Sequence, residues 1–95
     1  MRRHDTAVHG LKNIGPTIAA RLAAVGINSV GDLRGVGPAG AFKRLQRKYP
    51  AVTIPVCYYL YCLQGALDGV HWDALSPAVK DRLLEQAGVK RPRRR

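Results

Sequence analysis

A glycine–proline corner within residues 11–27 limits how this chain can fold more than any other part of its sequence. The segment reads LKNIGPTIAARLAAVGI. Gly15 can adopt the positive φ that a sharp corner needs, and Pro16 suits the first position of a helix, where an amide hydrogen would have no helical partner. We therefore expect a short helical turn, a tight corner and an alanine-rich helix that ends at Gly26. The apolar residues at helical spacing after the corner are Ala19, Leu22 and Ala23.

The same corner recurs 22 residues later in the chain. Residues 33–45, LRGVGPAGAFKRL, align with the segment that begins at residue 11. Such corners are typical of the helix-hairpin-helix motif, which holds a nucleic-acid backbone, and we predict two hairpins packed about a local pseudo-dyad. An ordinary helical corner and chance similarity between short segments are the alternatives. The identical pairs are Leu11/Leu33, Gly15/Gly37, Pro16/Pro38 and Ala19/Ala41.

The two copies depart from the Gly-hydrophobic-Gly pattern of this motif in different places. The second copy keeps both glycines, Gly35 and Gly37, but has Arg44 where the pattern has leucine. The first copy has Asn13 in place of the first glycine, and asparagine tolerates a left-handed backbone better than most residues. We expect the second hairpin to be the better anion contact and the first the better packing element.

Capping residues predict the remaining helices. Ser29 begins a short helix with a capping-box pattern, and Thr53 is expected to cap a long uncharged helix. That helix is apolar nearly all round, so it should lie at the centre of the fold. Ser76 caps a last helix that ends at Gly88. The chain is predicted to be all-α, a small five-to-six-helix bundle with tandem helix-hairpin-helix (SAM-like) motifs.

The helix predicted from Pro38 to Tyr49 has two different faces. Ala41, Phe42 and Leu45 form its core stripe. Its other side carries only positive charges at i,i+4 spacing, which repel one another slightly and favour an external anion. A merely solvated face is the alternative, although such faces usually mix charge signs. The four basic residues are Lys43, Arg44, Arg47 and Lys48.

The net charge of +10 is unevenly distributed along the chain. Residues 10–52 hold seven basic residues and one acidic residue, whereas residues 53–89 hold two basic and four acidic residues. This asymmetry is expected of a polyanion-binding face, and a solubility surface is the alternative. We expect a flexible basic N-terminus over residues 1–9, a helical domain over 10–89 and a flexible basic tail over 90–95.

Several other classes of protein lack support in the sequence. The longest uncharged stretch, 50–67, is interrupted by proline, glutamine and glycine, so it predicts a buried helix and no membrane span. The N-terminus lacks the apolar segment of a secretory signal, so we expect a cytoplasmic protein. Cys57 and Cys62 point to different sides of a helix and predict neither a disulfide nor a zinc site. His71 near Asp73 lacks a nucleophile, so we expect a capping role and neither an enzyme nor a cofactor site.

The two corners supply the chemistry that phosphate binding needs. Backbone N–H groups at a helix N-terminus are unpaired, and a glycine beside them leaves room for an anion. Basic side chains one turn further along would meet neighbouring phosphates without reading bases. The candidate nucleic-acid-binding residues are Gly15, Thr17, Ile18, Arg21, Gly37, Ala39, Gly40, Lys43, Arg44, Arg47 and Lys48.

The chain resembles the C-terminal domain of the TfoX family of bacterial competence regulators. The matching residues run from Leu11 to Leu84, and the stretch from Gly65 to Trp72, GALDGVHW, is their most specific part. The resemblance implies a small all-helical domain, related to helix-hairpin-helix proteins and linked to the regulation of DNA-uptake genes. Family members often carry a separate N-terminal domain, which we do not find in this sequence.

Three hypotheses for function follow from these observations. The first is a non-enzymatic DNA-binding or transcription-regulatory module that contacts phosphates without strong sequence preference. The second is a protein-interaction module that docks a transcriptional regulator or a polymerase subunit. The third is an RNA-binding or ribosome-associated protein.

Overall fold

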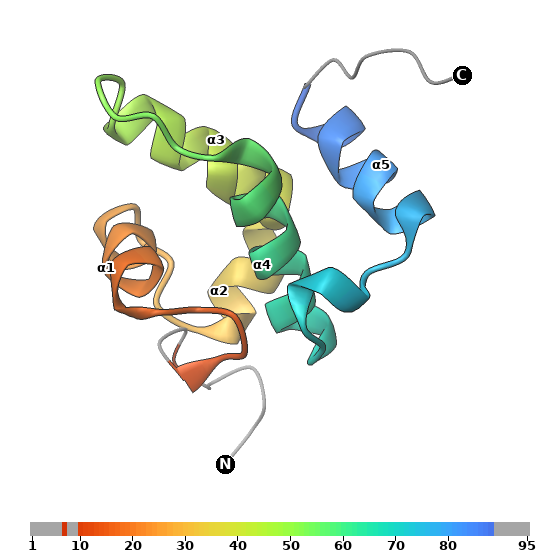
Figure 1. The fold of residues 1–95 in the computed structure, drawn as a ribbon. Helices are drawn as coiled ribbons and strands as arrows, with labels where there is room; N and C mark the ends of the chain where they lie inside the picture. The colour runs from red at the N-terminus through yellow and green to blue at the C-terminus, as the bar shows by residue number, and fades with distance from the viewer. Residues whose placement is uncertain (1–6, 8–9, 89–95) are drawn as a thin grey trace.

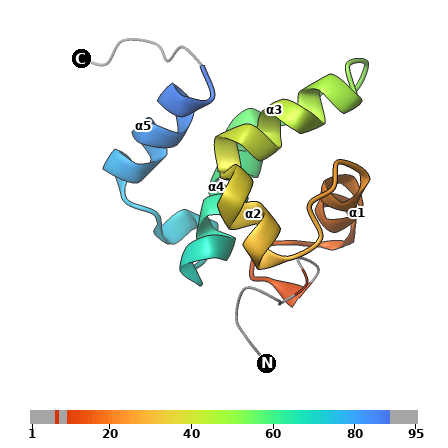
Figure 2. The same ribbon diagram turned by 180° about the vertical axis from the view of Figure 1, so that it is seen from behind.

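The computed structural model describes residue 7 and residues 10–88, and every regular element within them is helical. Figure 1 shows helices wrapped around a central one, and Figure 2 shows the same arrangement from behind. The predicted all-α fold is confirmed. The predicted flexible segments 1–9 and 90–95 lie outside the described residues, except for Ala7, which forms an isolated bridge with Ser29. The elements are α1 (Pro16–Ala24), α2 (Val30–Val36), α3 (Pro38–Lys48), α4 (Val56–Asp68), η3 (Trp72–Ala74) and α5 (Pro77–Gln86).

Helix α4 lies at the centre, as its apolar sequence predicts. It contacts α2, α3, α5 and the short 3-10 helix η3. Its first turn is an exception, because Cys57 and Tyr58 are exposed. The predicted core stripe of α3 is confirmed, whereas Ala23 of α1 is exposed and was wrongly assigned to the packed face. The largest fully buried apolar side chains are Phe42, Leu22, Ile27, Leu33, Leu45, Leu60, Leu63 and Leu83.

Most helices begin where their capping residues predict. The Ser29 hydroxyl accepts from the Asp32 amide at 3.1 Å, and the Asp32 carboxylate accepts from the Ser29 amide at 3.2 Å. The Ser76 hydroxyl accepts from the Val79 amide at the start of α5. The expected Thr53 cap is wrong, because α4 begins at Val56 with proline at its N-cap. A residue that precedes a proline avoids the helical backbone conformation, so this helix begins only after Pro55.

The two corners differ in backbone conformation. The expected positive φ at Gly15 is wrong, since its φ is −86°; in this corner Asn13 is left-handed, with a φ of 73°. In the second corner Gly37 has a φ of 82°, while Gly35 lies within α2. The left-handed residue therefore comes two positions earlier in the first corner than in the second. The second corner joins α2 directly to α3, whereas a bend and turn over residues 11–13 precede α1. The pseudo-dyad stays a prediction.

Asn13 ties the first corner to the turn between α4 and η3. Its side-chain nitrogen donates to the Val70 carbonyl at 2.9 Å, and its side-chain oxygen accepts from the Trp72 amide at 3.2 Å. Gly65 leaves the space for this contact, since a Cβ there would lie 2.5 Å from the Asn13 nitrogen. The His71 ring accepts from the Asp73 amide at 3.0 Å, which confirms its capping role. The GALDGVHW stretch is thus the surface that receives the first corner.

Candidate nucleic-acid interface

The corner between α2 and α3 has open backbone amides. Its left-handed glycine, Gly37, has a ψ of 155°, in a region of backbone space that is essentially restricted to glycine. The first amide of α3 with a backbone acceptor is that of Ala41, which bonds to the Gly37 carbonyl at 2.9 Å. The amides of Ala39 and Gly40 have no backbone acceptor among the described residues. Both residues are half-buried, and their amides are the candidate donors for water or an anion at this corner.

The α1 corner has open amides in more apolar surroundings. Here Ala19 is the first residue whose amide finds a backbone acceptor, and Thr17 and Ile18 precede it. Thr17 is exposed, but the Ile18 side chain is buried. The corner forms one wall of a cavity of about 360 Å³ whose other wall includes Pro55 and Tyr58. An anion would meet fewer polar partners here than at the second corner.

Three of the predicted basic residues have unpaired side chains. All three lie on α3 and are exposed. None of them makes a hydrogen bond, an ion pair or a ring contact with a described residue. Helix α3 contains no acidic residue, so its charge is not offset along its own length. A bound polyanion would therefore displace only water and counterions from this surface. We call this surface the α3 basic face; it consists of Lys43, Arg47 and Lys48.

Two of the predicted phosphate contacts are engaged within the fold. The Arg44 guanidinium donates to the Val25 carbonyl at 3.2 Å, at the C-terminal end of α1, where the helix dipole favours a cation. The Arg21 guanidinium donates to the Tyr59 hydroxyl at 2.8 Å and lies 5.6 Å from the centre of the Tyr49 ring. Arg21 thus joins α1 to α4 and to the end of α3. Its partners are tyrosines far along the chain, so local spacing gave no signal for this contact.

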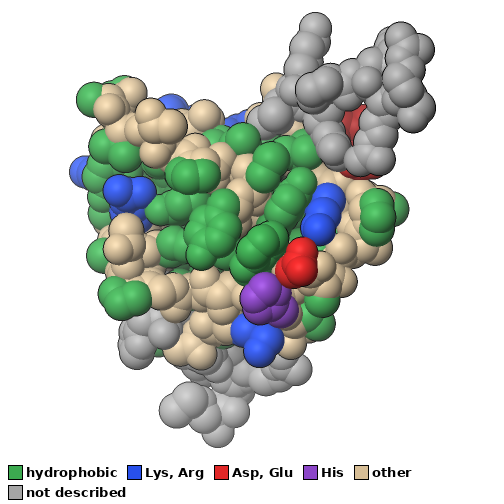
Figure 3. Space-filling view, viewed as in Figure 1, with side chains coloured by type: hydrophobic (Ala, Val, Ile, Leu, Met, Phe, Trp, Pro, Cys, Tyr) green, Lys and Arg blue, Asp and Glu red, His purple; other side chains and the backbone are tan. Residues whose placement is uncertain are grey.

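The face of the molecule shown in Figure 3 is largely uncharged. Hydrophobic and uncharged side chains cover most of it, and lysine and arginine are few. Tyr58 is 46% exposed and its ring centre lies 5.8 Å from that of Trp72. Exposed tyrosine beside partly buried tryptophan is typical of protein-contact surfaces.

Local hydrogen bonds and burial shift the pKa values of several of the described side chains. Hydrogen bonds from the backbone amides of Asn28 and Ser29 lower the pKa of Asp32. Burial raises the pKa of the Cys62 thiol, which faces the core, whereas Cys57 is exposed on the other side of α4. Within the described residues, no three His, Cys, Asp or Glu side chains gather as a metal site would require. The same part of the chain contains no helix both long and apolar enough to cross a membrane.

The fold defines a small all-helical domain. The chain belongs to the TfoX C-terminal domain family, whose model matches residues 4–87. It is also similar to the crystal structure of an uncharacterized protein from Listeria monocytogenes, at 28% identity and a TM-score of 0.75, covering 92% of this chain and 100% of that one. A crystal structure of a protein of unknown function from the same organism is 31% identical, with a TM-score of 0.72, and covers 84% and 95% of the two chains. No curated protein matches the chain.

Proposed function

We propose that this domain is a non-enzymatic, cytoplasmic DNA-binding module of the competence-regulator type. The observation that carries the proposal is the α3 basic face, whose three cations have no partner among the described residues. The open amides of Ala39 and Gly40 lie at the N-terminus of the same helix, where the dipole favours an anion. One duplex backbone would contact both. These are phosphate contacts, so we expect little sequence preference.

The proposal uses fewer residues than the sequence predicted. Arg21 and Arg44 also make contacts within the fold, with Tyr59 and Val25, so the proposal does not depend on them. The α1 corner faces an apolar cavity and is a packing element. The DNA contact is therefore centred on a single hairpin, α2–α3, and on the helix that follows its corner.

Charge reversal on α3 tests this proposal. Lys43→Glu with Arg47→Glu should weaken binding to labelled duplex DNA by at least about tenfold, because two phosphate contacts become repulsive. Lys80→Glu with Arg82→Glu on α5 changes the net charge equally and should have a much smaller effect. Fluorescence anisotropy at low salt measures both, and circular dichroism confirms that each variant folds. The proposal fails if both pairs weaken binding equally, or if only deletion of residues 90–95 does so.

A second candidate function is a protein-interaction module that docks a transcriptional regulator. The exposed Tyr58 and the cavity beside Pro55 favour it, because they form a largely apolar surface that includes none of the α3 cations. In this case a bound partner would survive nuclease treatment and the α3 charge reversal, but not Tyr58→Ala. An RNA or ribosomal role, the third hypothesis, predicts tighter binding to structured RNA than to duplex DNA in the same anisotropy assay.

A further inference from the structure

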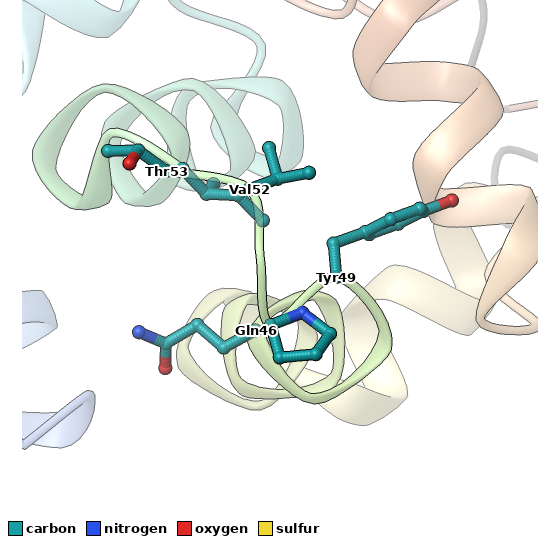
Figure 4. Close-up of a pocket in the computed structure, with 6 residues that line it drawn as sticks. Gln46, Tyr49, Val52 and Thr53 are labelled. Atoms are coloured by element: carbon teal, nitrogen blue, oxygen red, sulfur yellow. The ribbon is translucent and has the colours of Figure 1, made fainter.

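A second cavity lies where α3 ends. It measures about 420 Å³ and is formed by the last turn of α3 and the loop that leads to α4. Figure 4 shows the ends of the Gln46 and Thr53 side chains on the same side of the loop backbone. The residues that line the cavity are Gln46, Tyr49, Pro50, Val52, Thr53 and Ile54.

The lining of this cavity suits an uncharged, flat group with polar edges. None of its side chains carries a charge, so it offers a phosphate no cation and a metal ion no carboxylate. The Gln46 amide and the Thr53 hydroxyl have no hydrogen-bond partner among the described residues. Val52 adds an apolar surface that is 42% exposed. An amide that both donates and accepts, beside apolar surface, is the combination that proteins use to contact the edge of a nucleobase.

The cavity also adjoins the α3 basic face. Lys43, Gln46 and Arg47 are spaced at i, i+3 and i+4 within α3, so they lie on one side of the helix. Lys43 and Arg47 are cations without a hydrogen-bond or ion-pair partner among the described residues, and Gln46 lines the cavity. A nucleic-acid backbone that contacts the cations therefore passes the opening of the cavity.

We infer that this cavity receives an unpaired base of a DNA strand whose phosphates lie on the α3 basic face. A base inside a duplex is stacked and paired and does not reach a lateral cavity, whereas a base in a single-stranded overhang does. The domain therefore prefers duplex DNA with an overhang to blunt duplex DNA. This inference rests on the proposed function and adds its substrate class.

Anisotropy titrations with three labelled probes test the inference. The probes are a blunt duplex, the same duplex with a short thymidine overhang, and that duplex with an abasic overhang of equal charge. We expect the thymidine overhang to bind about fivefold more tightly than the abasic one, the effect of one net hydrogen bond. Gln46→Ala or Thr53→Ala should reduce this ratio toward one, while Gln86→Ala, an exposed glutamine on α5, should leave it unchanged.

The outcomes separate this inference from the proposal beneath it. Equal affinity for the thymidine and abasic overhangs overturns the cavity assignment but leaves DNA binding in place. A base-dependent ratio that survives both cavity substitutions also overturns it. Failure to bind any of the three probes overturns the proposed function itself.

Discussion

Replacing Gly65 with alanine is expected to destabilise the fold by about 3 kcal/mol, a large share of the stability of a domain of this size. The new Cβ would lie 2.5 Å from the Asn13 side-chain nitrogen and 2.7 Å from the Val70 carbonyl oxygen. The carbonyl belongs to the backbone and has little freedom to move. Relief therefore requires the Asn13–Val70 hydrogen bond to break, which leaves polar groups unpaired. Urea unfolding followed by circular dichroism measures the loss.

Gly35→Ala is the matched control for this substitution. Gly35 also lies within a helix, α2, but no atom lies within 4 Å of a Cβ built there. Alanine is the better helix former, so this variant should be as stable as the parent or more stable by up to about 1 kcal/mol. If Gly65→Ala is no less stable than Gly35→Ala, the Asn13 side chain does not pack against Gly65 in the way described.

Asn13→Ala is expected to destabilise the fold by about 3 kcal/mol, for two separable reasons. The substitution removes the side chain that pairs with the Val70 carbonyl and the Trp72 amide. It also places alanine at a φ of 73°, a left-handed backbone that is strained for a residue whose side chain cannot form a local hydrogen bond. Trp72, the only tryptophan in the chain, reports unfolding next to the altered contact through its fluorescence.

Asn13→Gly separates these two reasons. Glycine loses the same hydrogen bonds but adopts the left-handed backbone without strain, so this variant should be about 1 kcal/mol more stable than Asn13→Ala. Equal stabilities for the two variants would show that the backbone at residue 13 is not held left-handed. Wild-type stability for both would show that the Asn13 side chain contributes nothing to the fold.

Features set by neighbouring residues could be predicted from the sequence. Ser29 and Ser76 cap their helices through amides three residues away, so the pattern that reveals them is local. The α3 core stripe follows from helical periodicity, and the opposite side of the helix is exposed as expected. The family was also identified, because its motifs extend over most of the chain.

Features set by distant residues could not be predicted. Asn13 and its partner Val70 are 57 residues apart, and Arg21 and Tyr59 are 38 apart, so no spacing rule links them. Arg21 was therefore predicted only as a phosphate contact, and its hydrogen bond to Tyr59 was not predicted. For the first corner the sequence allowed a positive φ at Gly15 and a left-handed backbone at Asn13; the structure has it at Asn13, whose side chain also bonds to the Trp72 amide.

The most direct test of DNA binding by the α3 basic face is a salt series on the full chain and on a variant with Lys43, Arg47 and Lys48 all changed to glutamine. For each protein, the logarithm of the duplex-DNA association constant is plotted against the logarithm of the salt concentration. Each phosphate contact contributes about −0.9 to the slope of this plot. The slope for the variant should therefore be shallower than that for the full chain by about 2.7. Contributions from residues 90–95 are common to both proteins and cancel. Equal slopes, or no binding by the full chain at low salt, would contradict the account.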